Sequence, residues 1–219
     1  MTPPMKTPLI LNARERDKMN RALTEAARII KDGGLVAFPT ESFYGLGADP
    51  RNEDALRSLF EAKKRPANNP ILLLIDDTTR VFDYAEQVPE KSLVLMRKIW
   101  PGGLTLVFTA RPEVSSLITG GTGKIGLRVS SNLLACSLAR LVGGGITGTS
   151  GNISQRSPCL TAEDVLKEMG DNLDAILDGG PSPGGLGTTI LDLTEDPPRI
   201  LRKGMVSKGE IERIIGKIN

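Results

Sequence analysis

Short apolar segments alternate with segments of helical periodicity along most of this chain. Residues 71–75 are wholly apolar, which favours a strand buried on both faces. Residues 17–32 carry apolar side chains near a 3.6-residue period and are followed by Gly33, which is typical of an amphipathic helix and its end. Alternation of this kind, without a fixed repeat, predicts an α/β fold with a twisted, mixed β-sheet and flanking helices.

The remaining elements are expected on the same grounds. Asn52 is a suitable N-cap for a helix that runs to about Lys63. Ser207, with Glu210 three residues later, forms a capping box for a last short helix. Apolar patterning predicts further helices at 90–100, 132–142 and 161–169, and further strands at 35–38, 104–109, 125–129, 146–149, 175–177, 188–193 and 199–201.

The length of 219 residues favours one sizeable core. We therefore expect residues 13–219 to form a single domain, preceded by residues 1–12 as an N-terminal arm that is either loose or an edge strand. No linker is long enough to divide the chain. The Gly- and Pro-rich residues 179–187 are best interpreted as a mobile loop over a site.

The chain contains no histidine, which excludes Ser-His-Asp and Cys-His nucleophilic machinery and most zinc sites. A catalytic mechanism would then depend on positioning and electrostatics. The formal net charge of +2 is too small to indicate nucleic-acid binding, so any anion site must be a local cluster. Because neither a membrane-spanning run nor a secretory signal is evident, we expect a cytoplasmic protein without a membrane partner.

Polar side chains follow the strand predicted at 35–38. Thr40 and Ser42 lie where ligands bind in open α/β sheets, and Gly45 and Gly47 permit close approach of the backbone. The spacing fits neither a Walker A loop nor a dinucleotide fingerprint. A tight turn with satisfied hydroxyl groups is the simpler alternative.

Cationic side chains also lie near predicted strand ends. Lys63, Lys64 and Arg65 precede a proline that ends the helix, and Arg65 could hold a phosphate or carboxylate with two parallel hydrogen bonds. A solvated helix terminus explains the same lysines. Arg128 lies within an apolar strand, where its charge requires an anionic partner that is either a ligand or a carboxylate of the protein.

Two more polar segments complete the pattern. Ser150 and Asn152 flank a glycine directly after a predicted strand, so both could point at one ligand. Thr188 opens another predicted strand, and Arg202 closes the next. Each signal is weak alone, but all of them lie beside predicted strand ends and therefore converge on one region.

In combination and in order, these motifs resemble those of the YrdC-like family of threonylcarbamoyl-AMP synthases. The resemblance covers about residues 20–205 and is closest to the short, single-domain form, whose twisted mixed sheet has a concave substrate cavity. It is carried by Pro-Thr-Glu-Ser-Phe-Tyr-Gly-Leu-Gly at 39–47, Lys-Lys-Arg-Pro at 63–66, Trp-Pro-Gly-Gly-Leu-Thr at 100–105, Ile-Gly-Leu-Arg at 125–128, Ser-Gly-Asn at 150–152, Asp-Gly-Gly at 178–180 and Ile-Leu-Arg-Lys-Gly at 200–204.

The resemblance implies a nucleotidyltransferase that converts L-threonine, bicarbonate and ATP into threonylcarbamoyl-adenylate and pyrophosphate. Mg²⁺ would accompany ATP, with no organic cofactor and no protein-bound metal. A separate transferase complex would then pass the threonylcarbamoyl group to tRNA. The residues implied are Lys63, Arg65, Ser150 and Asn152 for catalysis and, with Arg202, for ATP, and Thr40, Arg128 and Thr188 for L-threonine, with Arg128 on its carboxylate.

The sequence departs from the family pattern at Ala67, Lys124, Cys159 and Gly187, which could change activity or substrate. One alternative is therefore a divergent YrdC-like paralogue that binds a nucleotide without this synthase activity. A second alternative, of another class, is a module that binds double-stranded RNA or tRNA on a basic concave surface. Its phosphate contacts would come from Lys63, Lys64, Arg65, Arg128, Arg202 and Lys203.

Overall fold

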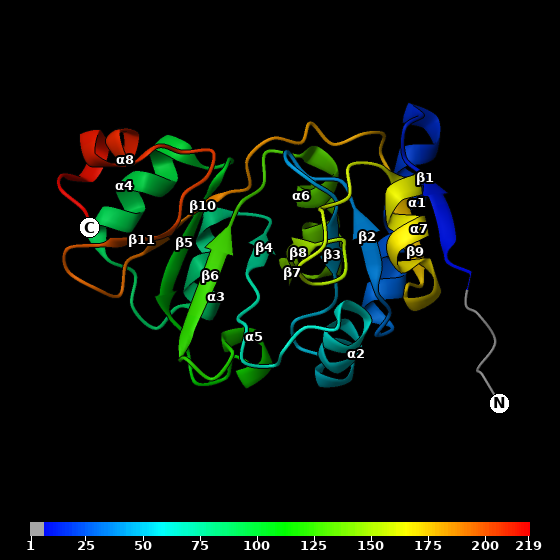
Figure 1. Ribbon diagram of the computed structural model, residues 1–219, viewed down its shortest axis with the longest axis horizontal. Coiled ribbons are helices and arrows are strands. Elements are labelled where there is room, and N and C mark those ends of the chain that lie inside the picture. The colour runs from blue at the N-terminus through cyan, green and yellow to red at the C-terminus, as the bar shows by residue number, and fades with distance from the viewer. Residues whose placement is uncertain (1–6) are drawn as a thin grey trace.

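The computed structural model describes residues 7–219, so half of the predicted arm at 1–12 lies outside the described residues. Two mixed β-sheets lie side by side along the long axis of the molecule, and helices pack on their faces (Figure 1). The predicted mixed α/β class is confirmed, with the strands divided between a five-stranded small sheet and a six-stranded large sheet.

The small sheet has the strand order β1-β9-β2-β3-β8, and β1 pairs with β9 in parallel at its edge. Helices α1 and α6 pack on one face, where they bury Val36 and Phe38, whereas Ala37 faces a second cluster with α2 and α7. This split follows from the alternation of side chains along a strand. The bounds are β1 Leu9–Asn12, β2 Val36–Phe38, β3 Gly45–Gly47, β8 Thr149–Ser150, β9 Ala175–Asp178, α1 Arg16–Lys31, α2 Glu53–Lys63, α6 Leu133–Val142 and α7 Ala162–Met169.

The large sheet has the order β11-β10-β5-β6-β4-β7. One face, which includes Leu106, Leu127 and Leu191, packs into an apolar core with α3, α4 and α8. The side chains between these residues point to the other face, which carries both polar and apolar side chains and faces the small sheet. The bounds are β4 Leu73–Ile75, β5 Leu104–Thr109, β6 Lys124–Arg128, β7 Gly145–Thr147, β10 Thr189–Asp192, β11 Arg199–Arg202, α3 Val81–Tyr84, α4 Glu90–Ile99, α5 Ser116–Thr119 and α8 Lys208–Ile215, with short 3₁₀ turns at Thr78–Arg80 and Gly170–Asn172.

The predicted helix starts are confirmed at their caps. Asn52 accepts the amide N–H groups of Asp54 and Ala55 at 3.1 Å each. The Ser207 hydroxyl accepts the amide of Glu210 at 3.2 Å, which is one of the two bonds of the predicted capping box. These bonds satisfy backbone donors that have no partner inside the helix.

Strand β3 was not predicted, because Gly45–Gly47 offers no alternating pattern. Its glycines are needed for packing: a Cβ atom on Gly47 would lie 2.9 Å from the Phe38 ring. The strand can therefore pair with β2 only because no side chain separates it from that ring.

The segment 179–188 connects β9 of the small sheet to β10 of the large sheet and runs across the gap between them (Figure 1). The hydrogen bonds that anchor it include those from the Gly184 amide to the Ser42 carbonyl at 2.7 Å and from the Ser182 amide to the Leu160 carbonyl at 2.8 Å. The predicted loop over a site is therefore tied to the turn that carries Thr40. Across residues 7–219, no helix combines the length and apolarity needed to span a membrane.

Candidate functional site

A cavity of about 600 Å³ lies between the polar face of the large sheet and the loops at the end of the small sheet. On β6, Lys124, Gly126 and Arg128 face the cavity, whereas Ile125 and Leu127 face the apolar core. This alternation places charged groups on a strand that is otherwise apolar. The concave cavity expected from the sequence is thus present.

Most of the charged side chains that line the cavity are cationic. Arg65, Lys124, Arg128, Arg199 and Arg202 line it, and Asp192 is the one carboxylate among its lining residues in the described chain. Apolar side chains such as Leu72, Val107, Ile190 and Leu201 separate the charged groups. A wall of this kind suits an anionic small molecule that also carries an apolar or planar part.

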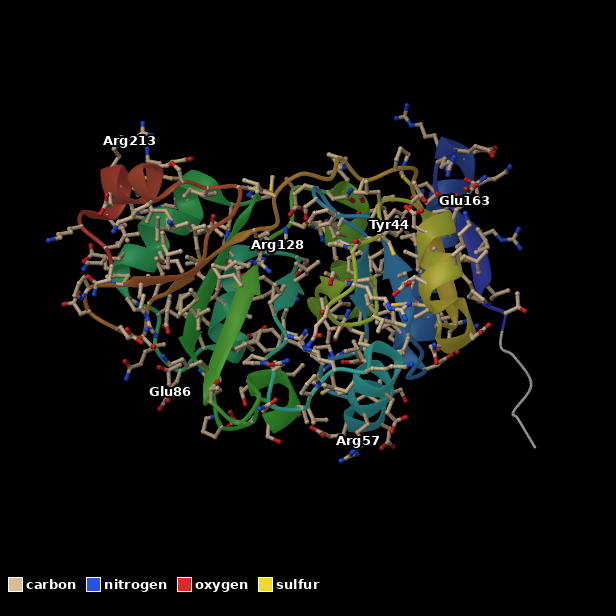
Figure 2. The ribbon with its side chains drawn as sticks, viewed as in Figure 1. Tyr44, Arg57, Glu86, Arg128, Glu163 and Arg213 are labelled. Atoms are coloured by element: carbon tan, nitrogen blue, oxygen red, sulfur yellow. The ribbon has the colours of Figure 1, made fainter. Side chains whose placement is uncertain are left out.

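Arg128 crosses from the large sheet toward the small sheet and is 4% exposed. Figure 2 shows it on the large-sheet side of the cleft, with Tyr44 on the other side. Its guanidinium forms an ion pair with Glu41, whose second oxygen accepts the Ser130 hydroxyl. Burial lowers the pKa of Arg128 to about 10, which still leaves it charged at neutral pH.

The structure therefore gives Arg128 the carboxylate partner that the sequence left open. Two nitrogens of the guanidinium, Nε and the Nη1 that faces Glu41, are buried and have no hydrogen-bond partner within residues 7–219. A buried N–H without a partner is costly, so this side of the cavity favours a ligand that accepts hydrogen bonds.

Thr188 and Arg202 meet beside Arg128. The Arg202 guanidinium donates to the Thr188 hydroxyl at 2.9 Å and to the Thr188 carbonyl at 3.0 Å. The Thr188 hydroxyl also contacts the Thr105 hydroxyl at 2.9 Å. The predicted site residues Arg128, Thr188 and Arg202 thus lie in one group. Burial lowers the pKa of Arg202.

Thr40 also lines the cavity, but its hydroxyl is used in its own turn. It donates to the Phe43 carbonyl at 2.7 Å and accepts the amides of Ser42 and Phe43 at 3.2 and 3.3 Å. Thr40 therefore contributes its backbone and the shape of this turn to the cavity. This agrees with the alternative of a tight turn with satisfied hydroxyl groups.

The remaining predicted residues divide into two pairs. Arg65 and Ser150 line the cavity, and the Arg65 guanidinium donates to the Pro70 carbonyl at 2.8 Å. Lys63 and Asn152 lie behind the wall. Asn152 donates to the carbonyls of Ile153 and Arg156, while Lys63 donates to the carbonyls of Ser150 and Asn152.

Sequence reasoning named Lys124 only as a departure from the family pattern and missed its partner in the cavity, Asp192. Lys124 Nζ lies 2.8 Å from a carboxylate oxygen of Asp192, which is 1% exposed and also accepts the Thr194 hydroxyl at 2.7 Å. Burial by itself would raise the pKa of Asp192, but the bonds from Lys124 and Thr194 outweigh it and lower that pKa. The available signal was the alternation of Ile190 and Asp192 along β10 with Thr188, which directly precedes the strand.

No cluster of three or more histidine, cysteine, aspartate or glutamate side chains is placed to hold a metal ion within residues 7–219. Neither cysteine belongs to a group of metal-binding side chains among the described residues. Cys159 is buried beside Lys63, and burial raises the pKa of its thiol to about 11, so it is a thiol at neutral pH.

The fold and the cavity together define a mixed α/β protein with a cationic ligand cleft between two sheets. The Sua5/YciO/YrdC family model, described as Telomere recombination, matches residues 28–204. The chain is 37% identical over 198 residues to threonylcarbamoyl-AMP synthase of Bacillus subtilis and 39% identical over 210 residues to that of Pyrococcus abyssi. This chain belongs to the Sua5/YciO/YrdC family.

The alignments cover 90% and 96% of this chain but 57% and 62% of those two relatives, so the chain spans about three fifths of their length. A relative from Idiomarina loihiensis is 37% identical, with 74% of this chain and 87% of that protein covered. Among solved structures, P. abyssi Sua5 complexed with L-threonine has a TM-score of 0.92 at 38% identity, covering 96% of this chain and 62% of that one. Escherichia coli YciO has a TM-score of 0.83 at 25% identity, covering 94% and 100%.

Proposed function

We propose that this protein is a threonylcarbamoyl-AMP synthase that uses L-threonine, bicarbonate and ATP. The observation that carries the proposal is the cavity itself, in which five cationic side chains surround a space of about 600 Å³. A threonine carboxylate, a carbamate and a triphosphate are all anionic, so this wall complements each of them. The names of the relatives and the threonine complex of P. abyssi Sua5 support the same reading.

The proposed chemistry needs no protein nucleophile, in keeping with a chain that lacks histidine. The threonine amine combines with bicarbonate, and water leaves to give the carbamate. A carbamate oxygen then attacks the α-phosphorus of ATP. The new oxygen–phosphorus bond forms as the bond to the β-phosphate breaks, and pyrophosphate departs. Fixed cations around the phosphorus stabilise the charge that develops in this step.

The residues take roles that follow from their positions. Arg65 and Arg202 would bind the phosphates, and Ser150 would orient the group being adenylated. Arg128, which lines the cavity, would hold the threonine carboxylate beside Thr188, and Thr40 would shape the turn against it. Lys63 and Asn152, expected from the sequence to be catalytic, would act from behind the wall.

Mg²⁺ would enter with ATP, because it is typically bound by substrate phosphates and only one or two carboxylates. Asp192, the one carboxylate that lines the cavity within the described residues, is already bonded to Lys124 and Thr194, so the phosphates of ATP would hold the ion. The ion would supply further charge compensation for the phosphates. We also propose a cytoplasmic location and a tRNA-modifying transferase complex as the acceptor of the product.

Burial argues against the RNA-binding alternative in the form that the sequence suggested. Two of its six cations, Lys63 and Arg128, are 1% and 4% exposed, so they cannot contact the phosphates of a docked duplex. Phosphate contacts are what give RNA binding its affinity and its salt dependence.

The test is pyrophosphate release from ATP by the purified chain, with and without L-threonine and bicarbonate. The proposal predicts release that requires both. ATP binding without release would favour the divergent paralogue. If ATP does not bind, a titration with duplex RNA at several salt concentrations tests the RNA-binding alternative, since binding to RNA phosphates weakens steeply with salt.

A further inference from the structure

Lys63 is the last residue of α2 and is the most deeply buried lysine of the cavity region, at 1% exposure. Its ammonium donates to the backbone carbonyls of Ser150 and Asn152, the latter at 2.6 Å. Its own carbonyl accepts the amide of Ser154 at 2.9 Å. One residue thus holds the segment 150–154 at three points.

The segment that Lys63 holds carries a wall of the cavity. Ser150 ends β8, pairs with Gly45 of β3 and lines the cavity. The Gly151 amide donates to the Tyr44 carbonyl at 2.7 Å, which joins the segment to the turn on the opposite side. A shift of 150–154 would therefore move Ser150 and the adjoining turn together.

Burying an ammonium is costly unless its hydrogen bonds are satisfied. A methionine would fill the same volume without that cost, so packing alone does not explain a lysine here. Two carbonyls that converge on one ammonium do explain it, because a charged donor forms stronger hydrogen bonds than a neutral one. Lys63 is also absent from the lining of the cavity, to which Arg65 belongs.

We propose that Lys63 is a positioning residue, which fixes the segment 150–154 from behind and so presents Ser150 to the ligand. It acts through that segment and does not touch the phosphates. The inference rests on the proposed function for the identity of the ligand, but its structural half can be measured without any ligand.

The experiment compares the wild-type chain with Lys63→Met and with Lys64→Met, a matched control in which the neighbouring, exposed lysine loses the same charge. Hydrogen exchange is measured at the amides of Gly151, Asn152 and Ser154, without ligand. Affinity for ATP with Mg²⁺ is then measured by calorimetry. We expect Lys63→Met to exchange at these amides about tenfold faster and to bind ATP about tenfold more weakly, as loss of a charged hydrogen-bonding group predicts. Lys64→Met should match the wild type.

Unchanged exchange in Lys63→Met would overturn the proposal, even if ATP affinity falls, because Lys63 would then act on the ligand directly. If the wild type does not bind ATP but exchange still rises in Lys63→Met alone, the proposed function fails and the positioning role stands.

Should Lys63→Met not fold, the wild type is measured across pH 6 to 9, with rates corrected for intrinsic exchange. The charged and titratable groups facing Lys63 are Arg65 and Cys159. Protection of 150–154 should fall relative to β5 as the ammonium loses its proton, and constant relative protection would refute the proposal.

Discussion

The ion pair between Glu41 and Arg128 links the loop after β2 of the small sheet to β6 of the large sheet, and replacing Glu41 by glutamine tests how much this pair contributes to stability. Both side chains are nearly enclosed, at 10% and 4% exposure. Removing one charge of a buried pair costs about 3 to 5 kcal/mol. Because glutamine keeps one oxygen to accept a hydrogen bond, we expect the low end, about 3 kcal/mol. A matched change on the surface, Glu25→Gln, breaks an exposed pair with Arg28 and should cost less than about 0.5 kcal/mol.

The assay is urea unfolding of Glu41→Gln and Glu25→Gln with and without L-threonine. A ligand that binds only the folded state stabilises it by about 2.7 kcal/mol at one hundred times its dissociation constant. If the threonine carboxylate contacts Arg128, it replaces the missing charge, so at a fixed threonine concentration Glu41→Gln should gain more stability than the wild type. A cost below about 1 kcal/mol for Glu41→Gln would refute the structural reasoning. An equal or smaller gain with threonine would refute the assignment of Arg128 to the carboxylate.

Three further predictions concern the other charged groups of the cavity region. Burial lowers the pKa of Lys63 to about 7 from 10.5, so the folded state binds fewer protons than the unfolded state between these values. The free energy of unfolding should therefore rise with pH from 7 to 9, by at most about 1.4 kcal/mol per pH unit, and denaturant titrations should show a smaller rise in Lys63→Met. Lys124→Met leaves Asp192 buried with its Thr194 bonds but without a cation. Because Lys124 is itself 36% exposed, we expect the free energy of unfolding to fall by about 1 to 2 kcal/mol in urea titrations. An unchanged free energy of unfolding would show that the ion pair does not contribute to stability. Arg202→Met should weaken ATP binding about tenfold or more in calorimetry, and unchanged affinity would remove Arg202 from the phosphate site.

Much of the fold follows from local sequence patterns. The helix at 16–31 and the strand at 104–109 lie within one residue of their predicted bounds, because their apolar periodicity is long and regular. The division into two sheets could not be predicted, since it depends on β9 pairing with both β1 and β2 across long stretches of chain. Strand β3 escaped prediction for a different reason: it has two glycines in three residues and no alternation to detect.

The sequence predicts which residues surround the cavity better than it predicts how their side chains are arranged. Motif positions at strand ends placed Arg65, Ser150 and Thr188 around one cavity, because strand ends share an edge of the sheet. The direction of the Lys63 side chain depends on the rotation of the last turn of α2, which the motif does not encode. Glu41 was likewise visible in the sequence, but only the folded chain shows that it is the partner of Arg128.

Direct detection of the product tests the central proposal most sharply. The purified chain is incubated with ATP, Mg²⁺, L-threonine and ¹³C-labelled bicarbonate, and the mixture is analysed at once by mass spectrometry. We predict a threonylcarbamoyl-adenylate that carries the ¹³C label and that disappears when threonine is omitted or Arg128 is replaced by alanine. ATP consumed without a labelled adenylate, or a product that forms equally well without threonine, would contradict the account.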